Sequence, residues 1–218
     1  MLSTRNFVHR YVPATGKTDR ERVMVVLHGL GDSLNGYHFL PQAMGIPEMS
    51  YLLLNAPDSY YGGYAWYDFM HDPAPGIHRS RELLLGMLDE LEGQGVPAAD
   101  VFLFGFSQGC VMSVNTALRA DKVLGGIVGV SGYVAFPLEY PAALGPAARS
   151  QKFLVTHGRR DPVLPFEPSR EQFQDLKKMG LDVEFVAYGK DHTMLLEELQ
   201  DIARWVRARF SQGSSAKQ

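Results

Sequence analysis

The pentapeptide GFSQG at 105–109 places Ser107 between two glycines. The residues before it, 101–106, are continuously apolar, and residues 108–119 after it repeat apolar side chains at helical spacing. A sharp turn from a buried strand into a helix presents a serine hydroxyl above the edge of a sheet. The flanking glycines let the strand and the helix pass closely. The alternative is a serine that only caps the helix, so the motif indicates a nucleophile only if a base accompanies it.

A serine hydroxyl needs a base at neutral pH, and the base needs a group that orients it. Asp161 and His192 each follow an apolar run typical of a buried strand. The order serine, aspartate, histidine, with acid and base on loops after later strands, suits a nucleophile on such a turn. Asp191 is the rival acid, but an immediate chain neighbour rarely folds back onto the ring. We therefore predict that Ser107 is the nucleophile, His192 the base and Asp161 the orienting acid.

The oxygen that becomes negative in a tetrahedral intermediate needs two amide donors. One donor is expected at the residue after the nucleophile, which is Gln108. The other is expected on a loop after an early strand, where the sequence has HGLGD at 28–32. Two glycines let that backbone turn its amides inward, although a tight turn without a catalytic role would use them too. We predict that the amides of Leu30 and Gln108 form an oxyanion hole.

Four motifs carry a resemblance to a known family: HGLGD, GFSQG, HGRRDPVLP and the pair DH before the last helix. Over residues 23–210 the chain resembles the phospholipase/carboxylesterase family of small serine hydrolases, which includes acyl-protein thioesterases and bacterial carboxylesterases. The resemblance implies a compact α/β-hydrolase fold, cleavage of carboxylic esters or thioesters, and the same five residues in the same roles. The sequence departs from the family at Arg159 and Arg160, where acyl-protein thioesterases usually have small or acidic residues.

Aromatic side chains gather in the segment 59–70, SYYGGYAWYDFM, which is too rich in glycine and too irregular for a regular strand. Aromatic loops near the carboxyl ends of parallel strands commonly line a ligand cleft. We expect Trp66, in a WYD run similar to the family's WFD, to form a wall of the acyl site, with Tyr64 and Tyr67 beside it. The alternative is a static cluster that anchors a long loop.

The elements that must position these residues alternate along the chain. Short apolar runs read as strands buried on both faces, which is typical of a parallel sheet covered by helices. Helical periodicity lies between them, which predicts an α/β-hydrolase fold, a mostly parallel sheet with helices on both faces. The expected strands are 23–28, 51–55, 101–106, 124–130, 153–157 and 183–188, with an antiparallel edge strand at 6–12; besides 108–119, helices are expected at 77–92 and 195–210.

The connection 131–151 is too short to hold a cap domain. We therefore expect an open site or one covered by short loops, with residues 60–67 as a flap.

The composition bounds the remaining possibilities. The chain has 218 residues, of which 45% are hydrophobic and 21% charged, which fits a single domain over 1–212 with a disordered tail at 213–218. The formal net charge of -3 and the lack of a basic cluster exclude a typical nucleic-acid-binding domain. Charged residues throughout 1–25 fit neither a secretory signal nor a membrane span, so a cytoplasmic location is expected.

No cofactor or metal is expected. The sequence lacks phosphate-cradling and dinucleotide-binding patterns and metal-ligand spacing, and its one cysteine, Cys110, is interpreted as a buried structural thiol. The sequence leaves the oligomeric state open, with a homodimer as one option.

The function predicted from these residues is hydrolysis of a small ester or acylated substrate through an acyl-enzyme. Acyl-protein thioesterase or lysophospholipase activity is the alternative within the enzymes. A binding module that keeps the fold without turnover is the alternative outside them.

Overall fold

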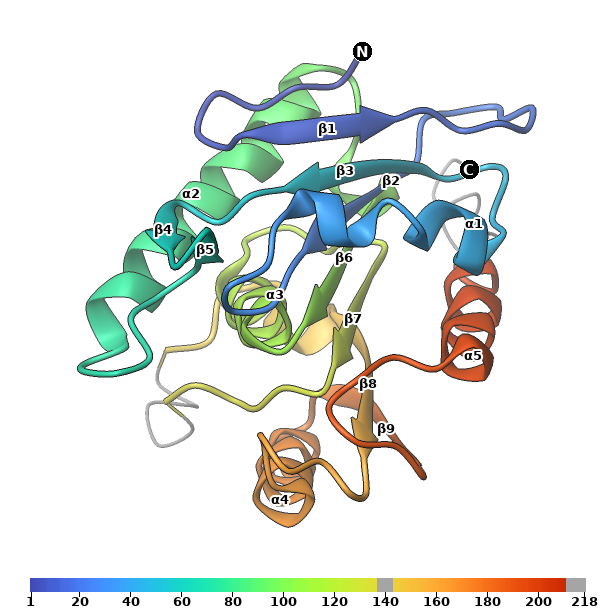
Figure 1. The fold of residues 1–218 in the computed structure, drawn as a ribbon. Coiled ribbons are helices and arrows are strands. Elements are labelled where there is room, and N and C mark those ends of the chain that lie inside the picture. The colour runs from blue at the N-terminus through green and yellow to red at the C-terminus, as the bar shows by residue number, and fades with distance from the viewer. Residues whose placement is uncertain (137–142, 211–218) are drawn as a thin grey trace.

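The computed structural model describes residues 1–136 and 143–210. Seven strands form one sheet in the order β1-β3-β2-β6-β7-β8-β9 (Figure 1). All neighbours pair in parallel except β1, which pairs antiparallel with β3 at the edge. The strands are β1 (His9–Val12), β2 (Val23–Leu27), β3 (Ser50–Leu54), β6 (Val101–Phe106), β7 (Gly126–Val130), β8 (Lys152–Gly158) and β9 (Asp182–Tyr188).

Helices cover both faces of this sheet, so the predicted fold class is confirmed (Figure 1). One face carries α2 (Ala74–Gly93), α3 (Gln108–Arg119) and α4 (Phe166–Lys178). The other face carries α1 (Leu40–Met44) and α5 (Leu196–Arg207). The central strands are buried, except for the partly buried Phe106 at the end of β6, because each face packs against its own apolar cluster; this explains their continuously apolar sequences. Short 3-10 turns occur at Leu34–Tyr37, Ala98–Asp100 and Ala148–Ser150.

The expectation that residues 59–70 contain no regular strand is wrong. Strands β4 (Asp58–Tyr60) and β5 (Gly63–Ala65) form a separate antiparallel hairpin. The two residues between them, Tyr61 and Gly62, both have positive φ values, 42° and 90°. That backbone matches the twist of a two-residue hairpin turn. Tyrosine is an uncommon residue for the first of these positions, which is why the sequence did not indicate a hairpin.

No cap domain follows β7: in the described part of 131–151, the only regular element is the 3-10 turn before β8. The predicted single domain over 1–212 stays a prediction, and the predicted tail at 213–218 lies outside the described residues. What matters for the site is that β2, β6, β8 and β9 all end at the same edge of the sheet, because they run parallel. The loops after them carry Leu30, Ser107, Asp161 and His192.

Candidate active site

Ser107 occupies a strained turn between β6 and α3. Its φ of 55° and ψ of -117° are unusual for a residue with a side chain, and such strain is commonly found at functional sites. The two glycines of the motif are required by space. A Cβ on Gly105 would lie 2.0 Å from the carbonyl oxygen of Gly109, and a Cβ on Gly109 would lie 2.1 Å from that of Leu27. The strand and helix therefore pass at a distance that only glycine permits.

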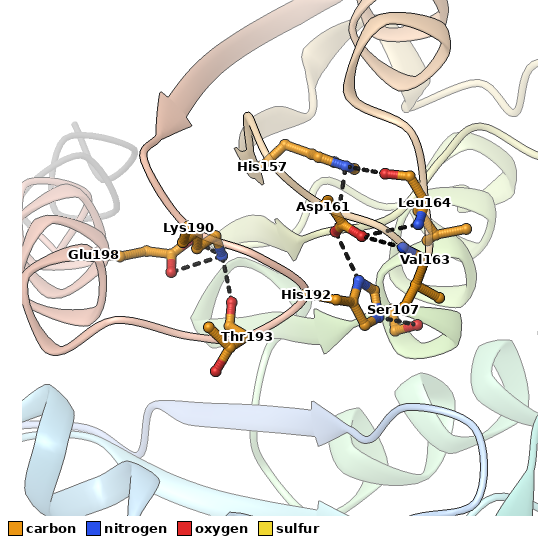
Figure 2. Close-up of polar contacts among 9 residues, drawn as sticks. All are labelled: Ser107, His157, Asp161, Val163, Leu164, Lys190, His192, Thr193 and Glu198. Carbon is orange, nitrogen blue, oxygen red and sulfur yellow. Dashed lines mark hydrogen bonds and ion pairs between the residues drawn. The ribbon is translucent and has the colours of Figure 1, made fainter.

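The structure brings together the three side chains that the sequence predicts to cooperate. The Oγ atom of Ser107 lies 3.0 Å from Nε2 of His192, and Nδ1 of His192 lies 2.7 Å from Oδ2 of Asp161 (Figure 2). With a proton on Nδ1 that bonds to the carboxylate, Nε2 is free to accept the serine proton. The geometry thus connects an alcohol, an imidazole and a carboxylate in one line of hydrogen bonds.

Asp161 is held as a hydrogen-bond acceptor by its own loop. Its Oδ1 accepts from the amides of Val163 and Leu164, each at 2.9 Å (Figure 2). Burial by itself would raise the pKa of Asp161, but these amides and the His192 ring outweigh burial and lower the pKa. The rival acid, Asp191, is exposed and pairs instead with Arg160 at 3.4 Å. The structure therefore favours Asp161 as the partner of the histidine.

A second histidine supports the same loop. His157 is buried, and its Nε2 donates to the carbonyl of Leu164 at 2.9 Å while lying 3.6 Å from Asp161 (Figure 2). Burial lowers the pKa of His157, so the neutral ring is favoured. The role of His157 could not be predicted from the sequence, because nothing in a linear sequence indicates that it faces the loop four residues later.

The HGLGD loop is positioned by its buried histidine. Nε2 of His28 accepts the amide of Ala56 at 3.0 Å, so its Nδ1 carries the proton and donates to the carbonyl of Gly29 at 2.6 Å. Burial lowers the pKa of His28, in agreement with a neutral ring. These contacts fix the backbone immediately before Leu30.

The amides predicted to form the oxyanion hole are available. In the HGLGD loop, the amide of Gly31 donates to Tyr64 at 2.9 Å and that of Asp32 donates to Gly29 at 3.3 Å. Within residues 1–136 and 143–210, the amides of Leu30 and Gln108 have no hydrogen-bond acceptor. Both residues line the cavity that contains Ser107.

That cavity has a volume of about 280 Å³ and is mainly apolar. Of the three predicted substrate-binding residues, only Tyr67 lines it. The expectation that Trp66 forms a wall is wrong, because Trp66 is not among the lining residues; its buried side chain donates from Nε1 to the carbonyl of His28 at 2.9 Å. The lining residues are Gly29, Leu30, Asp32, Tyr67, Phe69, Phe106, Ser107, Gln108, Tyr133, Val163, Leu164 and His192.

The prediction that Tyr64 lines the acyl site is also wrong. Its backbone forms a β-bridge with Asp32, which attaches the hairpin to the HGLGD loop, and its side chain is not part of the lining. The side chain of Gln108 holds Trp66 and Tyr67, accepting from the amide of Trp66 at 3.0 Å and donating to the carbonyl of Tyr67 at 3.1 Å. The sequence offered only the backbone role of Gln108. These bonds favour an anchored cluster over a flap.

The hydroxyl of Tyr67 bonds to that of Tyr133 at 3.0 Å, at the side of the cavity. Tyr133 was missed because it follows β7 without a motif of its own.

Arg159 lies against the ring of Phe166, and neither Arg159 nor Arg160 lines the cavity. Burial raises the pKa of the Cys110 thiol to about 12, which leaves it unreactive beside Ser107.

Across the described ranges 1–136 and 143–210, no cluster of three or more His, Cys, Asp or Glu side chains is arranged to hold a metal ion. Within those same ranges, no helix combines the length and the apolar content that crossing a bilayer requires.

A mostly parallel sheet with a serine at the turn from strand to helix defines the class of α/β-hydrolases. The family follows from the sequence comparison. The model of the Phospholipase/Carboxylesterase family matches residues 12–209, and the chain belongs to this family. The resemblance seen in the four motifs is thereby confirmed.

Individual relatives agree with this assignment. The chain is 29% identical to acyl-protein thioesterase 1 of Debaryomyces hansenii, over 89% of this chain and 94% of the relative. It is 30% identical to a probable carboxylesterase of Oryza sativa subsp. japonica, over 91% of this chain and 82% of the relative. Among solved structures, esterase PE8 matches with a TM-score of 0.83 at 27% identity, covering 94% of this chain and 99% of that one.

Proposed function

We propose that this protein is a carboxylesterase-type serine hydrolase that forms an acyl-enzyme on Ser107. The single observation that carries the proposal is the line of contacts from Ser107 through His192 to Asp161, at 3.0 Å and 2.7 Å. An isolated serine at a helix start would need neither partner. Their convergence at one edge of the sheet supports nucleophilic catalysis over a capping role.

The reaction follows from the positions of the protons. Nε2 of His192 takes the hydroxyl proton as Oγ of Ser107 attacks the ester carbonyl, and the amides of Leu30 and Gln108 stabilise the oxyanion. The imidazolium then gives its proton to the oxygen of the leaving group as the ester C–O bond breaks, and the alcohol departs. Water attacks the acyl-enzyme with His192 again as the base, and the acid is released. Asp161 keeps the proton of the imidazole on Nδ1 throughout.

Thioester cleavage is the second candidate. The apolar lining of the cavity suits the acyl part of either substrate, and several relatives are named acyl-protein thioesterases. The same residues would act, with a thiolate as the leaving group in place of an alkoxide. Comparing kcat/KM for an acyl ester and for the matching acyl thioester, over a series of chain lengths, decides between them.

A cytoplasmic location stays a prediction, to be tested by cell fractionation.

The test is hydrolysis of a p-nitrophenyl ester by the wild type and by Ser107→Ala. We expect turnover by the wild type and a loss of about 10⁵-fold in kcat for the variant, with the fold kept. Near-wild-type hydrolysis by the variant would refute the nucleophile. A folded wild type without turnover on esters and thioesters of any chain length would point to a binding module instead.

A further inference from the structure

A buried ion pair, Lys190 with Glu198, lies on the chain segment that carries the proposed base, with Lys190 two residues before His192. Lys190 is 2% exposed and Glu198 is 0% exposed, and Nζ of Lys190 donates to both carboxylate oxygens at 2.6 and 2.8 Å (Figure 2). Neither residue lines the cavity, and the reaction above uses neither. Burying two charges is costly unless their hydrogen bonds are satisfied, so a pair in this place calls for a structural explanation.

The side chain of Lys190 spans the turn that carries His192. The third N–H group of its ammonium donates to the carbonyl of Thr193 at 2.7 Å (Figure 2). The side chain therefore bridges Asp191 and His192, the two residues between Lys190 and Thr193. Glu198 also accepts the amide of Leu195 at 3.1 Å, which ties the pair to the start of α5. An ammonium has three donors, and these contacts use all of them. The turn is therefore held on both sides of the histidine.

The backbone of Lys190 is attached to the loop of the acid. The amide of Arg160, next to Asp161, donates to the carbonyl of Lys190 at 3.2 Å. A Cβ on Gly158 would lie only 2.4 Å from that same carbonyl oxygen, so glycine is needed for the two loops to approach. Through its backbone, Lys190 thus fixes the distance between the acid's loop and the base's turn.

We propose that the Lys190–Glu198 pair is a positioning device that holds the imidazole of His192 between Ser107 and Asp161. This inference rests on the proposed function. The side chain of His192 is 15% exposed, so packing alone leaves one side of the ring open. Misplacing a catalytic group by about 1 Å can cost about 100-fold in rate, and a turn without its bridge allows such a shift.

The test is the double variant Lys190→Met/Glu198→Gln. It removes both charges, keeps similar side-chain volumes and leaves an oxygen for the amide of Leu195. Glu198→Gln alone is the conservative partner, because Lys190 keeps its bond to Thr193. The matched control is Arg22→Met/Asp100→Asn, which removes a buried ion pair at the opposite edge of the sheet. kcat and KM for a p-nitrophenyl ester are measured per folded molecule, with folding followed by circular dichroism.

We expect kcat of the double variant to fall about 10- to 100-fold with little change in KM, because His192 is the one residue of this turn that lines the cavity and the rest of the lining is untouched. Glu198→Gln should keep most of the wild-type kcat, and the control should keep all of it. A folded double variant whose kcat lies within about twofold of that of the wild type overturns the proposal.

If the double variant does not fold, Lys190→Gln takes its place. The side-chain amide of a glutamine at 190 can still donate to Glu198. Because this side chain is one bond shorter than that of lysine, it cannot donate to Glu198 and to the carbonyl of Thr193 at the same time. The same fall in kcat is expected, and a kcat like that of the wild type overturns the proposal. An inactive wild type would instead refute the proposed function, and this inference with it, whatever the variants at 190 and 198 do.

Discussion

Two buried carboxyl groups lie at opposite edges of the same sheet, and they behave in opposite ways. Asp161 follows β8 at the carboxyl edge, and Asp100 precedes β6 at the amino edge. Their side chains are 0% and 5% exposed. Burial favours the neutral acid in both, yet the pKa of Asp161 is lowered and that of Asp100 is raised.

The difference lies in how each carboxylate is contacted. Asp161 accepts directed hydrogen bonds from two amides and an imidazole. Asp100 lies within 4 Å of Nε of Arg20 and of Arg22, but neither Nε atom has a hydrogen-bond partner in the described part of the chain. Burial raises the pKa of Asp100 more than the two guanidinium groups lower it. Aligned donors lower the pKa of a buried carboxyl group despite its burial, whereas nearby cations without aligned bonds do not offset the effect of burial.

The largest expected effect is on activity at the carboxyl edge. Asp161→Asn should lower kcat/KM by about 10⁴-fold, because the amide no longer holds the reactive tautomer of His192. The matched variant Asp191→Asn, on the turn beside the same histidine, should stay within about threefold of the wild type, because that carboxylate is exposed. Both are measured by ester hydrolysis. A large loss in Asp191→Asn with activity kept in Asp161→Asn would show that the acid is misassigned.

The next effect concerns stability. Gly109→Ala should lower the free energy of unfolding by more than about 3 kcal/mol, because the new methyl group would collide with the backbone of β2. The control is Gly86→Ala in the middle of α2, where a Cβ meets nothing within 4 Å. Gly86→Ala should raise stability by about 0.5 to 1 kcal/mol. Urea denaturation measures both, and equal small effects would contradict the close passage of strand and helix.

The smallest effect is on the pH dependence of unfolding. A carboxyl group with a lowered pKa in the folded state adds stability above its unfolded pKa, and this stability is lost as the pH falls through the folded value. The advantage of the wild type over Asp161→Asn should therefore shrink below about pH 4. The pKa of Asp100 is raised in the folded state, so the contribution of Asp100 to stability changes with pH in the opposite direction.

Because the pKa of Asp100 is raised in the folded state, its carboxyl group opposes folding at pH values above that folded pKa, and acidification relieves the cost. The wild type should therefore gain stability relative to Asp100→Asn as the pH falls from neutral toward about 4. Urea midpoints across this range measure both differences. Differences that change in the same direction would refute the contrast between the two edges.

The sheet and the three converging side chains could be predicted because their signals are local. Continuous apolar runs indicate buried strands, and the motifs around Ser107, Asp161 and His192 each stand directly after one. The place of Trp66 could not be predicted, since it packs in an apolar cluster and bonds to the carbonyl of His28, whose members and partner are far away in the sequence. The pairing of Lys190 with Glu198 likewise depends on the tertiary structure. A lysine in a polar loop is usually exposed, and the sequence shows no sign that this one is buried.

The most direct test of the account is reaction with a fluorophosphonate probe, followed by peptide mass spectrometry. Only a serine activated by a base reacts readily with such a probe. We predict one adduct per chain, located on Ser107, and much slower labelling in His192→Gln, which lacks the base. No adduct in the folded wild type, or an adduct on a different serine, would contradict the central claim.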